Sequence, residues 1–149
     1  MVRSELSALL ANIVLRASLL AWVAAQFLKF LLVLLLQRRF DVARLVGAGG
    51  MPSSHAAFVS ALAAATGRTV GWESPLFAVA LVFASIVVYD ATGVRQAVGR
   101  HAEVLNKILE DLYRGRTVPP ARLRELLGHS PLEALAGAAL GVLTALATT

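Results

Sequence analysis

Apolar residues in this chain form long runs that are separated by shorter polar stretches. Four runs have the length and composition of buried or membrane-spanning helices, namely Leu15–Leu36, Ser54–Thr66, Pro75–Ala91 and Pro131–Ala147. A helix that crosses a bilayer needs about 20 mostly apolar residues. The pattern therefore predicts about four spanning helices in one membrane-embedded domain, residues 1–149. The first dozen residues are expected at the interface or in a separate short helix.

A polar connector, residues 93–128, separates the third run from the fourth. Apolar residues recur at helical spacing from Gln96 to Tyr113, which predicts an amphipathic helix. The Pro119-Pro120 pair ends any continuation, and Ala121–Leu127 is expected to form another short helix. The predicted fold class is all-α: an integral membrane helical bundle of about four spanning helices with a cytoplasmic amphipathic helical connector.

The composition supports a membrane protein. Apolar residues make up 58% of the chain and charged residues 15%, and the mean hydropathy is +0.72, which is too apolar for a typical soluble domain of this length. The formal net charge of +5 would suggest nucleic acid in a soluble protein. Here the basic residues lie mostly between apolar runs, so membrane lipids are the expected partners and nucleic acid is not. The chain has no cysteine, which excludes disulfides and thiolate chemistry.

The distribution of basic residues predicts a topology. Residues 37–53 and 94–129 fall on one side of the membrane if four helices span it, and they carry ten lysines and arginines. The opposite side has only Arg3 and Arg68. The positive-inside rule then places the basic side in the cytoplasm, with the chain in a bacterial inner membrane. The competing explanation is that these arginines are present to bind phosphate.

Two short motifs open the second and fourth apolar runs. Residues 49–55 read Gly-Gly-Met-Pro-Ser-Ser-His, and residues 128–133 read Gly-His-Ser-Pro-Leu-Glu. Each places a histidine beside serine and proline where a helix should start. A helix start presents unpaired N–H groups and the positive end of the helix dipole, which suit a phosphate. His55 and His129 could therefore act together on one phosphoryl group, one as the nucleophile and the other as the general acid.

These motifs resemble those of a known superfamily. Pro52-Ser53-Ser54-His55 is similar to the Pro-Ser-Gly-His motif of the type 2 phosphatidic acid phosphatases and vanadium haloperoxidases. His129-x-x-x-Glu133 is similar to their last motif, His-x-x-x-Asp. Together with residues 89–95, 102–106 and 126–131, the chain resembles the superfamily's divergent branch of small membrane proteins.

The resemblance implies roles for individual residues. His129 would be the nucleophile that forms a phosphohistidine, Glu133 would orient it, and His55 would protonate the leaving group. Ser53 and Ser54 would cradle the phosphate. The further substrate-binding candidates are Lys29, Arg38, Arg39, Arg95, Arg124 and Asp90. The implied substrate is a lipid phosphate or polyprenyl (pyro)phosphate, with no metal and no cofactor, and a homodimer could complete the substrate groove.

Several of these residues have structural explanations too. Glu133 and Ser130 form the sequence of a capping box, and Lys29 could extend to the interface rather than bind phosphate. Asp90 and Arg95 could form a salt bridge. A solvated helix face would explain Glu103, Asn106 and Lys107.

The chain also departs from the superfamily pattern. Lys29 is followed by Arg38 and Arg39 out of register and without the usual proline, and Leu123 stands where an arginine is usual, between Arg122 and Arg124. These departures favour a second hypothesis, a non-catalytic protein that binds anionic lipid or helps to move it across the membrane. In a third, a structural assembly partner, neither histidine would matter.

Overall fold

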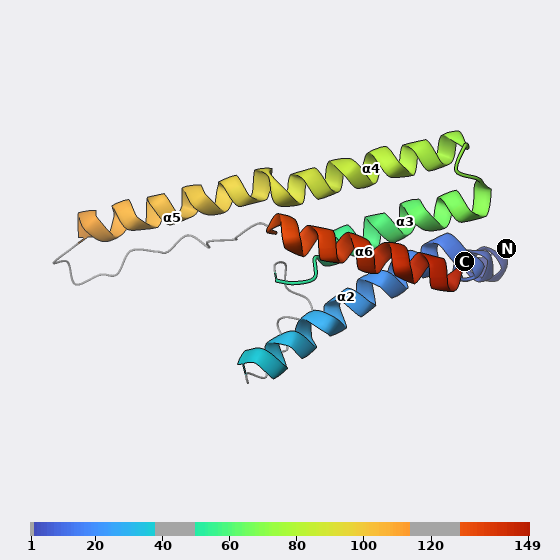
Figure 1. Cartoon of the computed structure of the whole chain (residues 1–149), viewed down its shortest axis with the longest axis horizontal. Helices are drawn as coiled ribbons and strands as arrows, with labels where there is room; N and C mark the ends of the chain where they lie inside the picture. The colour runs from blue at the N-terminus through green and yellow to red at the C-terminus, as the bar shows by residue number, and fades with distance from the viewer. Residues whose placement is uncertain (1, 38–49, 114–128) are drawn as a thin grey trace.

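The structure is a computed structural model that describes residues 2–37, 50–113 and 129–149, and within these ranges all regular structure is helical. Figure 1 shows the arrangement. The helices in chain order are α1 (Val2–Ala11), α2 (Ile13–Gln37), α3 (Ser54–Val70), α4 (Pro75–Thr92), α5 (Val94–Tyr113) and α6 (Pro131–Thr148). The predicted all-α helical bundle is confirmed.

The start of α2 is set by Asn12. Its side-chain Oδ1 accepts the N–H of Leu15 at 3.0 Å, and its N–H donates to the carbonyl of Leu9 at 3.2 Å. An asparagine that caps a helix in this way interrupts the preceding helix, because its side chain replaces the carbonyl that a continuous helix would offer. The first dozen residues therefore form the separate short helix that was one of the two expectations.

Helix α3 is the centre of the bundle. It packs against α2, α4 and α6, and its buried side chains are mostly alanines. On α2 the buried stripe is equally small, with Ala17, Ala21 and Ala25 one turn apart. Small side chains let helix backbones approach closely, which is how helices associate in lipid, where burial of apolar surface gives little driving force.

The α3–α4 turn is shorter than the sequence suggested. Helix α3 continues to Val70 and ends at Gly71, whose φ of 97° suits glycine. The side chain of Trp72 lies over Gly67, where a Cβ would stand 2.3 Å from the indole ring. Ser74 then caps α4 by accepting the N–H of Phe77 at 3.1 Å. The extra turn of α3 forms because Gly67 leaves room for Trp72, so this glycine does not end the helix.

Helices α4 and α5 run almost in line, and α5 extends beyond the end of the bundle (Figure 1). Gly93 joins them without breaking the hydrogen-bond pattern. Its N–H donates to Tyr89 at 2.8 Å and its carbonyl accepts from Ala97 at 3.0 Å. The amphipathic helix predicted from Gln96 is confirmed and begins at Val94.

Among the described residues, three stretches are long and apolar enough to cross a membrane: Ile13–Leu35, a window within Pro75–Tyr113, and Pro131–Thr148. Helix α3 has 17 residues and is largely surrounded by the other helices. The N–H of Ser53 donates to the carbonyl of Glu133 and that of His129 donates to Ala91, so α3 and α6 begin beside the last turn of α4. Gly50, just before α3, lies beside Lys29 of α2. This end of the bundle carries both histidine motifs.

Candidate active site

A capping box fixes the start of α6. The hydroxyl of Ser130 accepts the N–H of Glu133 at 3.3 Å, and the Glu133 carboxylate accepts the N–H of Ser130 at 2.9 Å. Pro131 occupies the first helical position, where its missing N–H costs nothing. The structural role considered for Glu133 is therefore confirmed, and it holds the carboxylate at the very start of the helix.

The same carboxylate faces His129. Oε2 of Glu133 lies 3.4 Å from Nδ1 of His129, and the histidine is 4% exposed. The backbone N–H of His129 donates to the carbonyl of Ala91 at 3.0 Å, which ties the motif to the last turn of α4. A carboxylate at Nδ1 favours the tautomer with a proton on that nitrogen and leaves the lone pair of Nε2 for chemistry.

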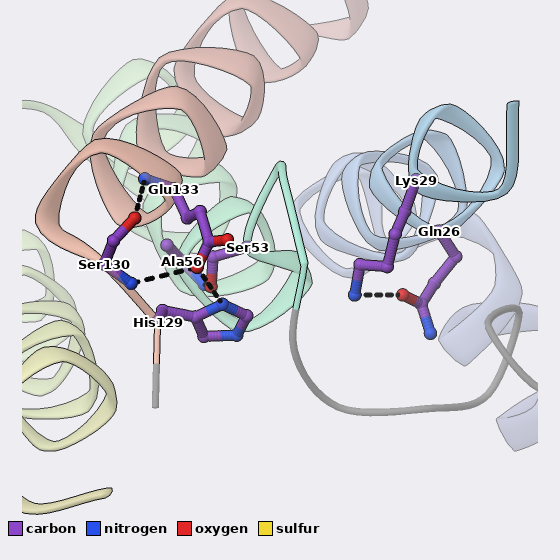
Figure 2. A network of polar contacts seen from close by, with 7 residues as sticks. All are labelled: Gln26, Lys29, Ser53, Ala56, His129, Ser130 and Glu133. Carbon is purple, nitrogen blue, oxygen red and sulfur yellow. Dashed lines mark hydrogen bonds and ion pairs between the residues drawn. The ribbon is translucent and has the colours of Figure 1, made fainter. Parts of the chain in front are cut away.

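The start of α3 is bonded to the start of α6. Ser53 caps α3 by accepting the N–H of Ala56 at 3.3 Å, and its own N–H donates to the backbone carbonyl of Glu133 at 2.9 Å. Ser53 and Ser54 are both buried. The two motifs, about seventy residues apart in sequence, thus form one unit of backbone and cap hydrogen bonds (Figure 2).

Gly137 makes this contact between helices possible. A Cβ at position 137 would stand 2.2 Å from the carbonyl oxygen of Ser53, and one at Gly141 would stand 2.2 Å from that of Ala57. Any larger residue would push α6 away from α3. Gly137 had no predicted role, but the pair Gly137 and Gly141, four residues apart, is a sequence signal for close helix packing.

The two histidines lie close together. The ring centroids of His55 and His129 are 6.2 Å apart and the ring planes are inclined by 55°. At this separation the two rings are close enough for both to contact one phosphoryl group bound beside them.

The direction of α3 and α6 adds an electrostatic field at this site that favours an anion. Helices α3 and α6 both begin at this site and run away from it in the same direction, as their contacts and Figure 1 show. The positive ends of two helix dipoles therefore converge on the histidines, and each end is worth roughly 0.3–1 kcal/mol to a nearby anion at an exposed position. This convergence favours a phosphate over a neutral ligand.

Lys29 is buried rather than extended to the interface. It is 1% exposed, its Nζ donates to Oε1 of Gln26 at 3.0 Å, and its stem lies beside Gly50. The segment that leads into α3 lies between His129 on one side and the side chains of Gln26 and Lys29 on the other (Figure 2). Gln26 on the same face of α2 is also buried, at 6% exposed, whereas Trp22, one turn earlier, is 41% exposed.

The structure brings only some of the other candidates to this end of the bundle. Asp90 is half-buried in the last turn of α4, one residue before Ala91. Arg95 lies in the first turn of α5, with its side chain outside the described residues. Arg38, Arg39 and Arg124 also lie outside them, as do Arg122, Leu123, Pro119-Pro120 and the short helix expected over Ala121–Leu127.

The polar cluster on α5 is partly as expected. Glu103 and Lys107 are exposed, in agreement with a solvated face, but Asn106 is 6% exposed. Within the described ranges, no group of three histidine, cysteine or acidic side chains gathers as metal ligands would.

Comparison with known proteins identifies the family. The profile of the Divergent PAP2 family matches residues 10–144, a range that includes both histidine motifs and Lys29. The chain belongs to the Divergent PAP2 family. One relative is the uncharacterized membrane protein YuiD of Bacillus subtilis, which is 40% identical over 149 residues that cover 93% of this chain and 94% of YuiD. No solved structure matches the chain.

Family membership and the helices agree on the class of protein. A Divergent PAP2 chain with membrane-length apolar helices and a membrane-protein relative is an integral membrane protein. The resemblance to the phosphatidic acid phosphatase superfamily that the two histidine motifs indicated is confirmed at the level of this divergent branch.

Proposed function

We propose that this protein is a membrane phosphatase that hydrolyses a lipid phosphate or polyprenyl (pyro)phosphate through a phosphohistidine. The observation that carries the proposal is the pair of histidine rings 6.2 Å apart, with the Glu133 carboxylate 3.4 Å from Nδ1 of the buried His129. A nucleophile, its orienting carboxylate and a second histidine in reach are the parts that such a reaction needs.

In the first step, Nε2 of His129 attacks phosphorus and forms a P–N bond as the bond from phosphorus to the leaving oxygen breaks. His55 donates its proton to that oxygen, so an alcohol leaves from a monoester or a phosphate from a diphosphate. Glu133 stabilises the positive charge that develops on the His129 ring. The N–H groups of the first turns of α3 and α6 stabilise the negative charge on the phosphoryl oxygens.

In the second step, water attacks phosphorus and the P–N bond breaks. His55, now neutral, accepts a proton from the water, inorganic phosphate leaves, and both histidines return to their starting states. Lys29 supplies a buried positive charge near the segment that leads into α3. The same two residues thus perform both steps.

The proposal includes an orientation. The motif-bearing end of the bundle would face the cytoplasm of a bacterial cell, with the chain in the inner membrane. Ten lysines and arginines in residues 37–53 and 94–129 support this placement, against Arg3 and Arg68 on the other side. The substrate headgroup would then be one that is presented at the cytoplasmic surface.

The test is phosphate release by the purified full chain from a panel of lipid monophosphates and polyprenyl pyrophosphates. His129→Ala should reduce release to background and His55→Ala should reduce it by about 10²-fold or more, as loss of general acid–base catalysis does. His101→Ala is the matched control, because His101 is exposed on α5, outside the site. Its release should equal that of the unmodified chain.

Trapping the intermediate makes the test sharper. Acid-labile, base-stable ³²P on the protein, present in the unmodified chain and absent from His129→Ala, would support the phosphohistidine. No release from any substrate, with vanadate failing to bind, would sink the enzyme proposal.

A second candidate is a protein that binds anionic lipid without cleaving it. The departures from the superfamily pattern around Lys29 and Leu123 favour it. It predicts that lipid phosphate binds equally well to His129→Ala, with no release from any substrate.

A further inference from the structure

An apolar groove lies between α2 and α4. Among the described residues, the backbones of these helices do not pack against each other, although each packs against α3. Helix α3 therefore forms the floor of the gap, and side chains of α2 and α4 form its walls. All three are part of the bundle that we place in the membrane, so lipid has access to the groove from the side.

The end of the groove nearest the active site is a cavity of about 280 Å³. Leu19 and Trp22 form one wall, Val87 forms the other, and His55 lies on the floor beside Phe58 and Val59. Among the described residues that line this cavity, the only ionisable side chain is His55, whose ring is 6.2 Å from that of His129. An apolar chain in the cavity would thus have its polar end at the two histidines.

A second cavity of about 470 Å³ continues in the same direction. Its floor includes Leu62, Thr66 and Thr69. Together with His55 and Val59 of the first cavity, these residues follow one another every three or four positions, so they lie on a single face of α3. Both walls also advance by about one turn, from Leu19 to Leu15 on α2 and from Val87 to Phe83 on α4.

The polar atoms in the second cavity are already used within their own helices. The hydroxyl of Thr66 donates to the carbonyl of Leu62 at 2.7 Å, and that of Thr69 donates to Ala65 at 2.8 Å. Asn12 accepts from the N–H of Leu15. These side chains satisfy their hydrogen bonds locally and add no demand for a polar ligand, so the groove suits hydrocarbon over its whole length.

We propose that this α2–α4 groove holds the single long hydrocarbon chain of the lipid phosphate, with the phosphate at His55 and His129. The inference rests on the proposed function and narrows its substrate class. The floor from His55 to Val70 is about 22 Å long at 1.5 Å per residue, which is most of the ~30 Å hydrocarbon core. It is one row of side chains wide, which fits one chain, and its depth sets the chain length that the protein prefers.

Two matched pairs of Leu→Trp variants test the groove. Leu19 lines the end near His55 and is 46% exposed, whereas its neighbour Leu20 is 48% exposed and lies outside the groove. Leu76 lines the far end and is 58% exposed, whereas Leu81 is 48% exposed and lines a hollow on another side of α4. All four are surface positions, so the added indole should leave folding intact.

The measurement is kcat/KM for alkyl phosphates from butyl to hexadecyl, and for a polyprenyl phosphate, with the full chain in nanodiscs. The unmodified chain should prefer long chains. Leu76→Trp should lower kcat/KM for the longest chains by roughly 10-fold, the scale of discrimination by an apolar pocket, and leave the shorter ones within twofold. Leu19→Trp should lower kcat/KM for every substrate except those with the shortest chains. Leu20→Trp and Leu81→Trp should leave kcat/KM unchanged for all of the substrates.

Equal effects within each pair, or a chain-length profile that Leu76→Trp leaves unchanged, would overturn the groove as the chain site. The polyprenyl and straight-chain arms distinguish the two sources of the hydrocarbon. An effect that appears only with rising protein density in the nanodisc would assign the groove to a second copy of the chain instead.

Cross-linking separates failure of the groove from failure of the phosphatase. A hexadecyl phosphate with a diazirine at the chain end should label the peptides that carry Leu76 and Phe83, and labelling should fall in Leu76→Trp. If no substrate releases phosphate but this labelling is observed, the phosphatase proposal fails and the groove stands as a lipid site. Labelling spread evenly over α4, including Val82 on its outer surface, would overturn the groove whatever the hydrolysis shows.

Discussion

Glu133 serves two purposes with one side chain, and substitution can separate them. Gln retains the acceptor that the N–H of Ser130 needs, because glutamine also completes a capping box. It removes the carboxylate charge 3.4 Å from Nδ1 of His129. We expect Glu133→Gln to unfold within about 0.5 kcal/mol of the unmodified chain but to lose about 10²-fold in kcat, because the imidazole then lacks its charged partner.

Glu133→Ala is the companion variant and removes both functions. Loss of the cap should lower the free energy of unfolding by about 1 kcal/mol in addition to the loss of activity. Thermal unfolding in detergent and single-turnover phosphate release measure the two effects. Full activity in Glu133→Gln, with losses of stability and activity only in Glu133→Ala, would show that the side chain acts only as a cap.

The buried ammonium of Lys29 supplies a second prediction at the scale of one residue. Lys29→Met removes the cost of burying a charge but also removes the donor to Oε1 of Gln26, so the free energy of unfolding should change by no more than about 1–3 kcal/mol. If Lys29 helps to hold phosphate, KM should rise by about 10- to 100-fold, the worth of a hydrogen bond to a charged group. The control is Lys107→Met on α5, where the lysine is exposed. An unchanged KM in Lys29→Met would assign the lysine to packing alone.

At the scale of helices, the contact between α6 and α3 depends on two glycines. A Cβ at position 137 or 141 would stand 2.2 Å from a backbone oxygen of α3, and a backbone moves less easily than a flexible side chain. Gly137→Ala and Gly141→Ala should each lower the free energy of unfolding by about 3 kcal/mol. Ala139→Leu, at an exposed position on the same helix, should not.

The two glycine variants should differ in activity. Gly137 lies against Ser53, whose N–H is bonded to Glu133, whereas Gly141 is one turn farther from the histidines. Gly137→Ala should therefore reduce activity per folded molecule, while Gly141→Ala retains more of it. Vanadate titration counts the folded sites in each sample. Equal activity per site would show that the shift of α6 leaves the histidines in place.

The sequence predicts those features of the fold that depend on residues close together in the chain. The predicted starts of α3, α4 and α6, at residues 54, 75 and 131, agree with the structure, in which Ser53, Ser74 and Ser130 cap these helices from within one turn. The contact of Gly137 with Ser53, the bond from His129 to Ala91 and the groove between α2 and α4 join distant segments. No local rule specifies them. That α4 continues in line into α5 was missed because glycine in a sequence suggests a break, and Gly93 keeps its helical bonds.

At the scale of the whole molecule, the site and the groove have a consistent relation to the membrane. The histidines lie at the end of the bundle where the basic segments attach, and the groove leads from them toward the α3–α4 turn at the other end. The phosphate would thus stay at the charged surface while the chain reaches into the hydrocarbon core. This arrangement requires α3 to cross the membrane, although it is shorter than the other spanning helices.

The absence of native cysteine makes the topology directly measurable. Single cysteines in place of Met51, Glu73 and His101 would sit at exposed positions before α3, in the α3–α4 turn and on α5. In intact cells an impermeant maleimide should label Glu73→Cys alone, because the positive-inside rule puts the other two in the cytoplasm. Met51→Cys and His101→Cys should react after the membrane is permeabilised.

Labelling of Met51→Cys and His101→Cys in intact cells would place the histidines on the outer surface. The arginines of the connector would then be explained by phosphate binding rather than by topology. Equal labelling of Met51→Cys and Glu73→Cys would show that α3 does not cross the membrane, and the groove would then lie outside the hydrocarbon core that its lining requires.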